Sequence, residues 1–230
     1  YAALSYCWGG PQPYMATQAV AEKPIDFSGL GRTIQDAIVG TENLGLQYLW
    51  VDAICIAQHD DTEKAIEIGK MADIYQGSYI TISAARAASY QEGFLSPYDT
   101  DQEVRITLKV KCPDGKVSSI ILQEHREQPP KGNDFGPVMD RAWCLQEHVL
   151  APRVLIYTSS ALHFCCRTHI RSDSMNVVGG GSNFQPNALA ALRKGGKTTM
   201  EAWQSIVAEF AKRSITVESD RLPAISAVAQ

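Results

Sequence analysis

The stretch YAALSYCWGG at residues 1–10 is a short apolar run that ends in a cluster of polar and aromatic side chains. Ser5, Tyr6 and Trp8 form this cluster. Gly9, with the glycine and the proline that follow it, permits only a turn. An apolar run bounded by a turn predicts a buried strand. Ligand groups converge at strand ends in an open α/β sheet, so we expect these side chains to line a crevice.

A second apolar run, YLWVDAICIAQHDD at residues 48–61, carries an acidic residue in its middle. Residues 48–56 predict the most apolar strand of the chain. Asp52 interrupts this strand, and its carboxylate would be costly to bury unless it were paired or lay at the open end of the strand. We therefore expect Asp52 near the crevice, where it either orients a ligand or accepts hydrogen bonds from backbone N–H groups.

A third stretch, RAWCLQEHVLAPRVLIY at residues 141–157, begins as a helix and continues as a strand. Trp143 and Glu147 are four residues apart, so they share one face of the helix. If this face looks into the crevice, it adds an aromatic plane and a carboxylate to the groups of the first two stretches. By residue type alone, Trp143 would be a core side chain and Glu147 a surface or capping carboxylate, so both interpretations stay open.

Between these stretches the pattern alternates between helix and strand. Thr33, followed three residues later by Asp36, makes a capping pattern at the start of one helix. Residues 62–75 predict a second helix, and residues 79–84 a short β-branched strand. This β-α-β-α-β order predicts an α/β fold with a doubly wound sheet, in which parallel strands are joined by right-handed crossovers and covered on both faces.

The pattern changes over residues 99–140, where two alternating runs flank Pro-Asp-Gly. This is typical of an antiparallel β-hairpin, inserted here after the third strand. Two further strands are predicted at 153–158 and 161–166, and a helical segment with an amphipathic helix at about 186–230. We expect one domain that covers residues 1–230.

Composition favours a cytoplasmic protein that does not bind nucleic acid. The 230 residues are 45% hydrophobic, and the formal charge is −4 with basic residues scattered along the chain, so no polyanion site is indicated. No stretch approaches the ~20 apolar residues that span a bilayer. The six cysteines lie mostly in apolar patterns without a secretory leader, which predicts reduced thiols. Because the chain opens inside a strand motif, we expect its natural start to lie further upstream.

The three stretches, in this order, resemble the fungal heterokaryon-incompatibility (HET) domain. The phrases of that family look like L-S-Y-x-W-G, W-V-D-x-x-C-I-x-Q and R-x-W-x-x-Q-E-x-x-L-x-x-R-x-L. The closing segment DRLPAISAVAQ at residues 220–230 is also similar to the family's C-terminal phrase. The resemblance implies an effector of non-self recognition and programmed cell death that acts with an upstream regulator protein.

A more distant resemblance is to the Toll/interleukin-receptor (TIR) domain, which has a flavodoxin-like fold. It rests on the order of elements, with Ser-Tyr at the end of the first strand and W-C-x-x-E on a late helix. Some TIR domains cleave NAD with a glutamate in such a helix. Carried onto this chain, the catalytic residue is Glu147, and the Ser-Tyr strand end is Ser5 and Tyr6.

We therefore expect NAD, or a related nucleotide, as the substrate rather than as a bound cofactor. Its binding groups are expected to be Ser5, Tyr6, Trp8, Gly9, Asp52 and Trp143. By analogy with TIR proteins, self-association would activate catalysis. The alternative is a signalling module that oligomerises and recruits partners without turnover.

Two other sites are weighed against this expectation. Cys144 and His148 lie four residues apart on one helix, but they lack an orienting third group and an oxyanion hole. His163 and Cys165 would point to one face of a strand and Cys166 to the other, so no metal site is predicted.

Overall fold

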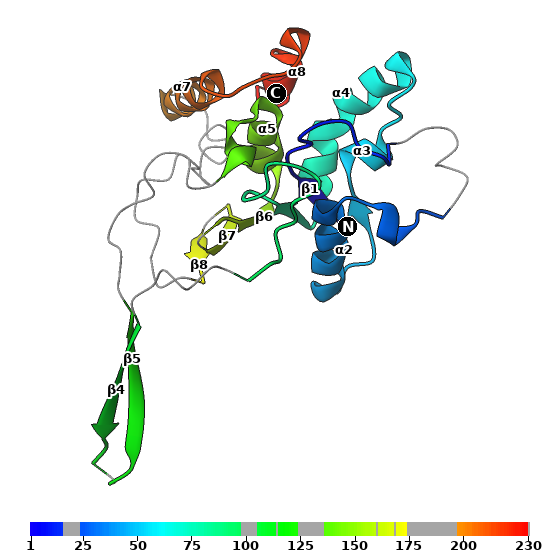
Figure 1. The fold of residues 1–230 in the computed structure, drawn as a ribbon. Helices are drawn as coiled ribbons and strands as arrows, with labels where there is room; N and C mark the ends of the chain where they lie inside the picture. Colours follow the sequence, from blue (N-terminus) through cyan, green and yellow to red (C-terminus); the bar gives the residue numbers. More distant parts are fainter. Residues whose placement is uncertain are drawn as a thin grey trace.

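The computed structural model of the chain is built around a six-stranded sheet (Figure 1). The structure describes residues 1–15, 24–97, 105–113, 115–123, 136–159, 161–167, 169–173 and 197–229. The strands of the sheet, in spatial order, are β2 (Leu49–Trp50), β1 (Ala2–Ser5), β3 (Ile80–Ser83), β6 (Arg153–Tyr157), β7 (Leu162–Cys166) and β8 (Ile170–Ser172). The first four are parallel to one another, whereas β7 and β8 pair antiparallel. The predicted parallel α/β sheet is therefore confirmed at the centre, with a mixed edge.

Helices cover both faces of this sheet. They are α2 (Arg32–Asn43), α4 (Asp61–Gly77) and α5 (Ala142–Leu150). Successive residues of β1 point to opposite faces, so Leu4 packs in a cluster with Ile34 of α2, and Ala3 packs with Tyr75 of α4 and Leu145 of α5. Figure 1 shows α2 on one side of the sheet and α4 and α5 on the other.

The second apolar run is not the long strand that we predicted. Only Leu49–Trp50 pairs with β1, and a short helix, α3 (Asp52–Cys55), follows directly. Asp52 accepts a hydrogen bond from the N–H of Ala53 at 2.6 Å, and the backbone of Ile54 and Cys55 bonds back to Val51. An apolar run fits a buried helical turn as well as a strand, and here these local bonds favour the turn.

The capping role predicted for Thr33 and Asp36 is wrong. The N-cap of α2 is Gly31, and Thr33 and Asp36 are buried inside the helix. Both side chains instead bind the loop after β3, as described below. The next helix, α4, begins at a true cap, because Asp60 accepts hydrogen bonds from the N–H groups of Thr62 and Glu63 at 2.8 and 3.0 Å.

The predicted hairpin is confirmed. It consists of β4 (Arg105–Lys111) and β5 (Val117–Gln123), which pair antiparallel in a separate two-stranded sheet. Residues 177–185 include three consecutive glycines, which is typical of a loop, and they lie outside the described residues.

The C-terminal segment is helical and packs on α5. Its elements are α7 (Lys197–Ala211), the 3-10 helix η3 (Glu218–Asp220) and α8 (Pro223–Ser226); two further 3-10 helices are η1 (Phe27–Gly29) and η2 (Pro137–Asp140). Ile206, Phe210 and Ala224 join the cluster that also holds Leu145 and Leu150. The helix that carries Glu147 is thus held between the sheet and the end of the chain.

Candidate functional site

Two serines lie side by side where the central strands end. Ser5 and Ser83 are register partners at the carboxyl ends of β1 and β3, and both are buried. Because Ala3 faces α5, Ser5 two residues later faces α5 as well. His148 of α5 places its Nε2 3.0 Å from Ser83 Oγ. The strand ends and one face of α5 therefore form a buried polar centre.

Glu147 lies in this centre with only 4% of its surface exposed. Burial raises the pKa of the carboxyl group to about 7, although the charge of Arg141 and the nearby Ser5 hydroxyl act in the opposite direction. No cation lies within ion-pair distance of Glu147 in the described part of the chain. Neither Ser5 Oγ nor Glu147 Oε2 completes a hydrogen bond with another described residue. Buried polar atoms without partners are rare in proteins, and a catalytic role is one explanation for them.

Arg141 is a cation of the site, and from its sequence position it could either pair with local carboxylates or hold a phosphate. It directly precedes α5, and its Nη1 donates a hydrogen bond to the backbone carbonyl of Tyr6. Burial lowers the pKa of its guanidinium, but the nearby Cys144, Glu147 and Asp52 outweigh this effect and keep it raised. The sequence feature that indicates a buried role for Arg141 is its position immediately before an apolar helix, where a solvated charge is unusual.

Asp52 and Trp8 are in direct contact. The indole Nε1 of Trp8 donates to Asp52 Oδ2 at 2.8 Å. Burial raises the pKa of the Asp52 carboxyl, while Arg141 and the hydrogen bonds from Trp8 and Ala53 partly offset that rise. Of the two roles expected for Asp52, the hydrogen bond from a backbone N–H group is present at Ala53, while the other oxygen binds Trp8. A role in orienting a ligand stays a prediction.

Tyr6 lies at the same strand end and is also buried. The side-chain amide of Gln12 donates to its hydroxyl oxygen at 2.8 Å. Burial and the negative charge of Asp52 raise the pKa of the phenol, so it stays protonated. Tyr6 and Asp52, from different stretches of sequence, are therefore neighbours as we expected.

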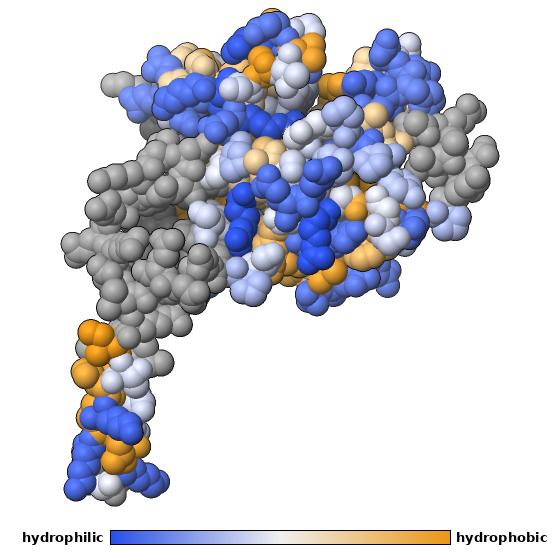
Figure 2. Space-filling view, viewed as in Figure 1, coloured by the Kyte–Doolittle hydropathy of each residue, from blue (hydrophilic) through white to orange (hydrophobic). Residues whose placement is uncertain are grey.

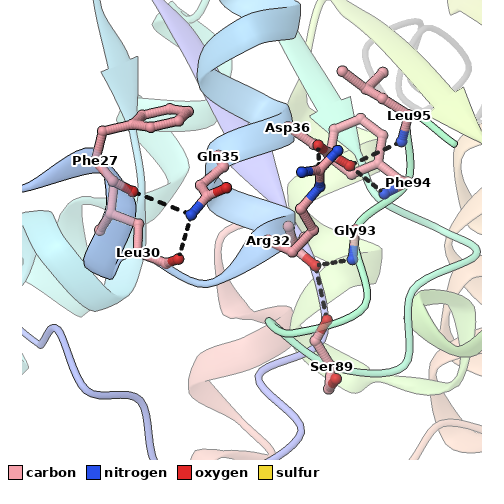
Figure 3. A network of polar contacts seen from close by, with 10 residues as sticks. Phe27, Leu30, Arg32, Gln35, Asp36, Ser89, Gly93, Phe94 and Leu95 are labelled. Carbon is pink, nitrogen blue, oxygen red and sulfur yellow. Dashed lines mark hydrogen bonds and ion pairs between the residues drawn. The ribbon is translucent and has the colours of Figure 1, made fainter.

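The loop after β3 closes one side of this region and is bound to α2 (Figure 3). Asp36 Oδ2 accepts from the N–H groups of Phe94 and Leu95 at 2.7 and 2.9 Å, and Oδ1 pairs with Arg32 at 3.0 Å. The hydroxyl of Thr33 donates to the carbonyl of Ser89 at 2.8 Å.

This loop reaches back to the turn after β1. Tyr90 donates its N–H to the carbonyl of Trp8 at 3.2 Å. Gly9 has a φ of +69°, and a Cβ there would lie 2.2 Å from the Cβ of Ser89. The turn therefore requires glycine at position 9, and the fixed loop holds Trp8 toward Asp52.

Trp143 has a different environment from the other predicted site residues. Its Nε1 lies 3.4 Å from Asp220 Oδ2, and its ring packs in the cluster formed by α4, α5, α7 and α8. These contacts attach α5 to the C-terminal segment. The structure thus brings together Ser5, Tyr6, Trp8, Gly9, Asp52 and Glu147, while the described contacts of Trp143 are made elsewhere.

The thiolate–imidazole alternative finds no support in the geometry. Burial raises the pKa of the Cys144 thiol well above its usual range, and burial lowers that of His148 to about 3. His148 lies against Ser83 rather than against Cys144. On β7, His163 and Cys165 share the buried face as predicted, and no cluster of metal-binding side chains occurs within the described ranges.

An open groove lies at the other end of the strands. Tyr1, Tyr48, Leu49, Trp50 and Ile74 line its apolar volume of about 370 Å³. Tyr1 and Tyr48 precede β1 and β2, whereas Ser5 and Ser83 end their strands. The groove is therefore separate from the polar centre. Among the described helices, none combines the length and the apolar character needed to cross a bilayer.

The fold and the polar centre define an α/β domain with an acidic site at the carboxyl ends of parallel strands. The family model of the heterokaryon incompatibility protein (HET) matches residues 1–147, which include Ser5, Asp52 and Glu147 but end one residue before His148. The chain belongs to the HET family, which indicates a role in fungal heterokaryon incompatibility and cell death. Comparison with curated proteins and with solved structures gave no significant match.

Proposed function

We propose that this domain is a cell-death effector that hydrolyses NAD, with Glu147 as its catalytic residue. The observation that carries the proposal is the state of Glu147. It is a buried carboxyl group with a pKa of about 7 and one oxygen without a partner among the described residues, located where parallel strands end.

A single carboxylate is sufficient for the proposed reaction. Nicotinamide leaves as a neutral molecule when the bond from its ring nitrogen to the ribose C1′ breaks, so no general acid is needed. Positive charge develops on the ribose, and an ionised Glu147 would stabilise it. Water then adds its oxygen to C1′ and releases a proton. Ordinary glycosides differ, because their leaving oxygen requires a second, protonated carboxyl group.

The neighbouring residues fit a nucleotide ligand. Asp52 offers a carboxylate for ribose hydroxyls, and the Trp8 ring, fixed by its bond to Asp52, offers a stacking surface. Ser5 and Tyr6 contribute hydroxyl groups, and Gly9 shapes the turn that carries Trp8. The order β2-β1-β3-β6 of the parallel strands is that of flavodoxin-like folds, which favours the TIR-like assignment.

Burial of Glu147 also favours regulation. Glu147 is only 4% exposed, so the site must open before a dinucleotide can enter. We propose that self-association or an upstream regulator opens the site and gives access to cytoplasmic NAD. Trp143 would act in this step by coupling α5 to the C-terminal segment, rather than by stacking on the ligand.

Nicotinamide release from NAD tests the proposal. The purified chain is assayed over a range of concentrations and after tethering to force association. Turnover should appear in the associated state and be lost in Glu147→Gln. Glu218→Gln, which changes a glutamate with 80% of its side chain exposed, is the matched control and should retain activity. Turnover that survives in folded Glu147→Gln would refute the assignment.

A non-catalytic scaffold is the second candidate, and one observation favours it. Several large apolar side chains of the β4–β5 hairpin are exposed, as in a surface that binds a partner. Absence of nicotinamide release in every state of association would favour this function.

A further inference from the structure

The β4–β5 hairpin has one apolar face that nothing in the described chain covers. Ile106, Leu108, Val110 and Ile120 are all exposed, and the pairing of Leu108 with Ile120 places them on the same face. Figure 1 shows the hairpin projecting away from the six-stranded sheet, and Figure 2 shows hydrophobic residues along it. A two-stranded hairpin alone is at best marginally stable in water, so this face needs a partner surface.

The opposite face of the hairpin carries basic residues, together with the exposed Val117 that pairs with Lys111. Lys109 and Lys111 alternate with Leu108 and Val110, so they point the other way. Residues 105–123 contain four basic residues and one acidic residue, in a chain whose formal charge is −4. The hairpin thus carries +3, and the rest of the chain −7. Two hairpins would repel each other, whereas a hairpin and the body of another copy attract.

The body offers an apolar surface at the edge of its sheet. β2 is the outermost strand and pairs with β1 alone in the described sheet. Beside it lies the groove of about 370 Å³, in which Tyr48 is 71% exposed and Ile74 of α4 forms one side. The helix α4 has four acidic and two basic residues, so the groove has a negatively charged neighbour. An exposed strand edge of this kind accepts a further strand.

We propose that the β4–β5 hairpin of one molecule docks in the β2 groove of a second molecule, so that copies of this chain join head to tail. The two surfaces differ, so the contact is heterologous and leaves a free hairpin at one end and a free groove at the other. In Figure 1 the hairpin lies on the β8 side of the sheet, away from the β2 edge. The groove is also at the amino ends of the strands, so docking leaves the polar centre around Glu147 uncovered.

Sedimentation velocity of the full chain over a concentration series tests the proposal. The wild type should form species larger than dimers, and high salt should dissociate them. Leu108→Asn combined with Ile120→Asn removes the apolar face and should give a monomer. Ser119→Asn, which changes the basic face, is the control and should associate like the wild type. Tyr48→Asn should also give a monomer, because it alters the groove.

Mixing the two kinds of variant decides between head-to-tail and symmetric contacts. The hairpin variant keeps its groove and Tyr48→Asn keeps its hairpin, so the mixture should form one-to-one dimers and nothing larger. Self-association of Tyr48→Asn alone, or a wild type that stays monomeric throughout the series, would overturn the proposal. The experiment does not use Glu147, so its outcome is independent of NAD hydrolysis, and repeating it in Glu147→Gln separates the two.

Discussion

Trp8 and Asp52 are 44 positions apart in the sequence, yet the indole of one donates to the carboxylate of the other at 2.8 Å. This bond joins the turn after β1 to the first residue of α3. It fixes both a carboxylate and an aromatic ring beside the polar centre. Two of the motifs that resemble the HET family therefore meet in one contact.

We expect Trp8→Phe to destabilise the domain. The substitution keeps an aromatic ring but leaves Asp52 Oδ2 without its donor, and a hydrogen bond to a charged group contributes about 1.5–3 kcal/mol. The loss should appear as a lower free energy of unfolding in urea.

Trp143→Phe is the matched control for that experiment. Its indole bond to Asp220 is longer, at 3.4 Å, and that carboxylate is only partly buried. Its cost should be below about 1 kcal/mol, as for an exposed polar pair. If the two substitutions cost the same, the Trp8–Asp52 bond has no special role.

The stability of the domain should depend on the ionisation of Glu147. Its carboxyl group has a pKa of about 7 when folded and an ordinary value of 4.5. Between these two pH values the folded state holds a proton that the unfolded state has lost, so stability falls as pH rises. At about 1.36 kcal/mol per pH unit, the total loss approaches about 3 kcal/mol.

Glu147→Gln cannot ionise and should lack this loss. Urea unfolding of both proteins is measured from pH 4 to pH 8. The free energy of unfolding of the variant should rise relative to that of the wild type as the pH increases from 4.5 to 7. His148, whose pKa is lowered to about 3, weakens both proteins equally as the pH falls below 6.5, so it cancels in the comparison. Parallel stability curves would mean that Glu147 is not buried in its protonated form.

The sequence predicted the elements whose pattern depends on local burial alone. Ile80 and Ile82 are apolar and β-branched because they lie on one face of β3, in the buried cluster that also holds Ile34 of α2. Asp36 was misassigned because its partners, Phe94 and Leu95, lie almost 60 positions away. A three-residue strand such as β8 has too little pattern to be recognised.

The residues of the site were predicted on three different grounds. Ser5 lies at the end of a predicted strand, and Asp52 was expected at the crevice because a carboxylate inside an apolar run is costly to bury. Glu147 was assigned from the resemblance to TIR domains. Ser83 was missed, and the role of Arg141 stayed open between pairing with a carboxylate and holding a phosphate, because the role of each depends on which strand lies next to which helix. Trp143 shows the limit of helical spacing, since four residues of separation did not place its contacts beside those of Glu147.

Asp36→Ala should strongly destabilise the domain, although Asp36 is remote from any proposed chemistry. The change removes the hydrogen-bond acceptor of the N–H groups of Phe94 and Leu95, and it removes the ion pair with Arg32. Leaving one buried donor and one partly buried donor unsatisfied should cost about 3 kcal/mol. Hydrogen exchange at Phe94 and Leu95 should accelerate. Asp73→Ala, on an exposed face of α4, should stay within about 0.5 kcal/mol of the wild type.

Substitutions at Gly9 and Gly45 distinguish two reasons for glycine at a position, namely the backbone conformation and the lack of space for a side chain. Both have positive φ angles, +69° and +72°, but a Cβ at Gly45 meets nothing within 4 Å, whereas one at Gly9 lies 2.2 Å from Ser89 Cβ. Gly45→Ala should cost about 1–2 kcal/mol, the conformational term alone. Gly9→Ala adds steric overlap, which should lower the free energy of unfolding by about a further 1–3 kcal/mol.

The overlap at Gly9 should also displace the turn that carries Trp8. Tryptophan fluorescence of folded Gly9→Ala should therefore shift, while Gly45→Ala keeps the wild-type spectrum. If the polar centre binds a nucleotide, NAD binding should weaken in Gly9→Ala and stay unchanged in Gly45→Ala. Equal stability and equal spectra of the two variants would show that the loop after β3 does not hold Trp8 in place.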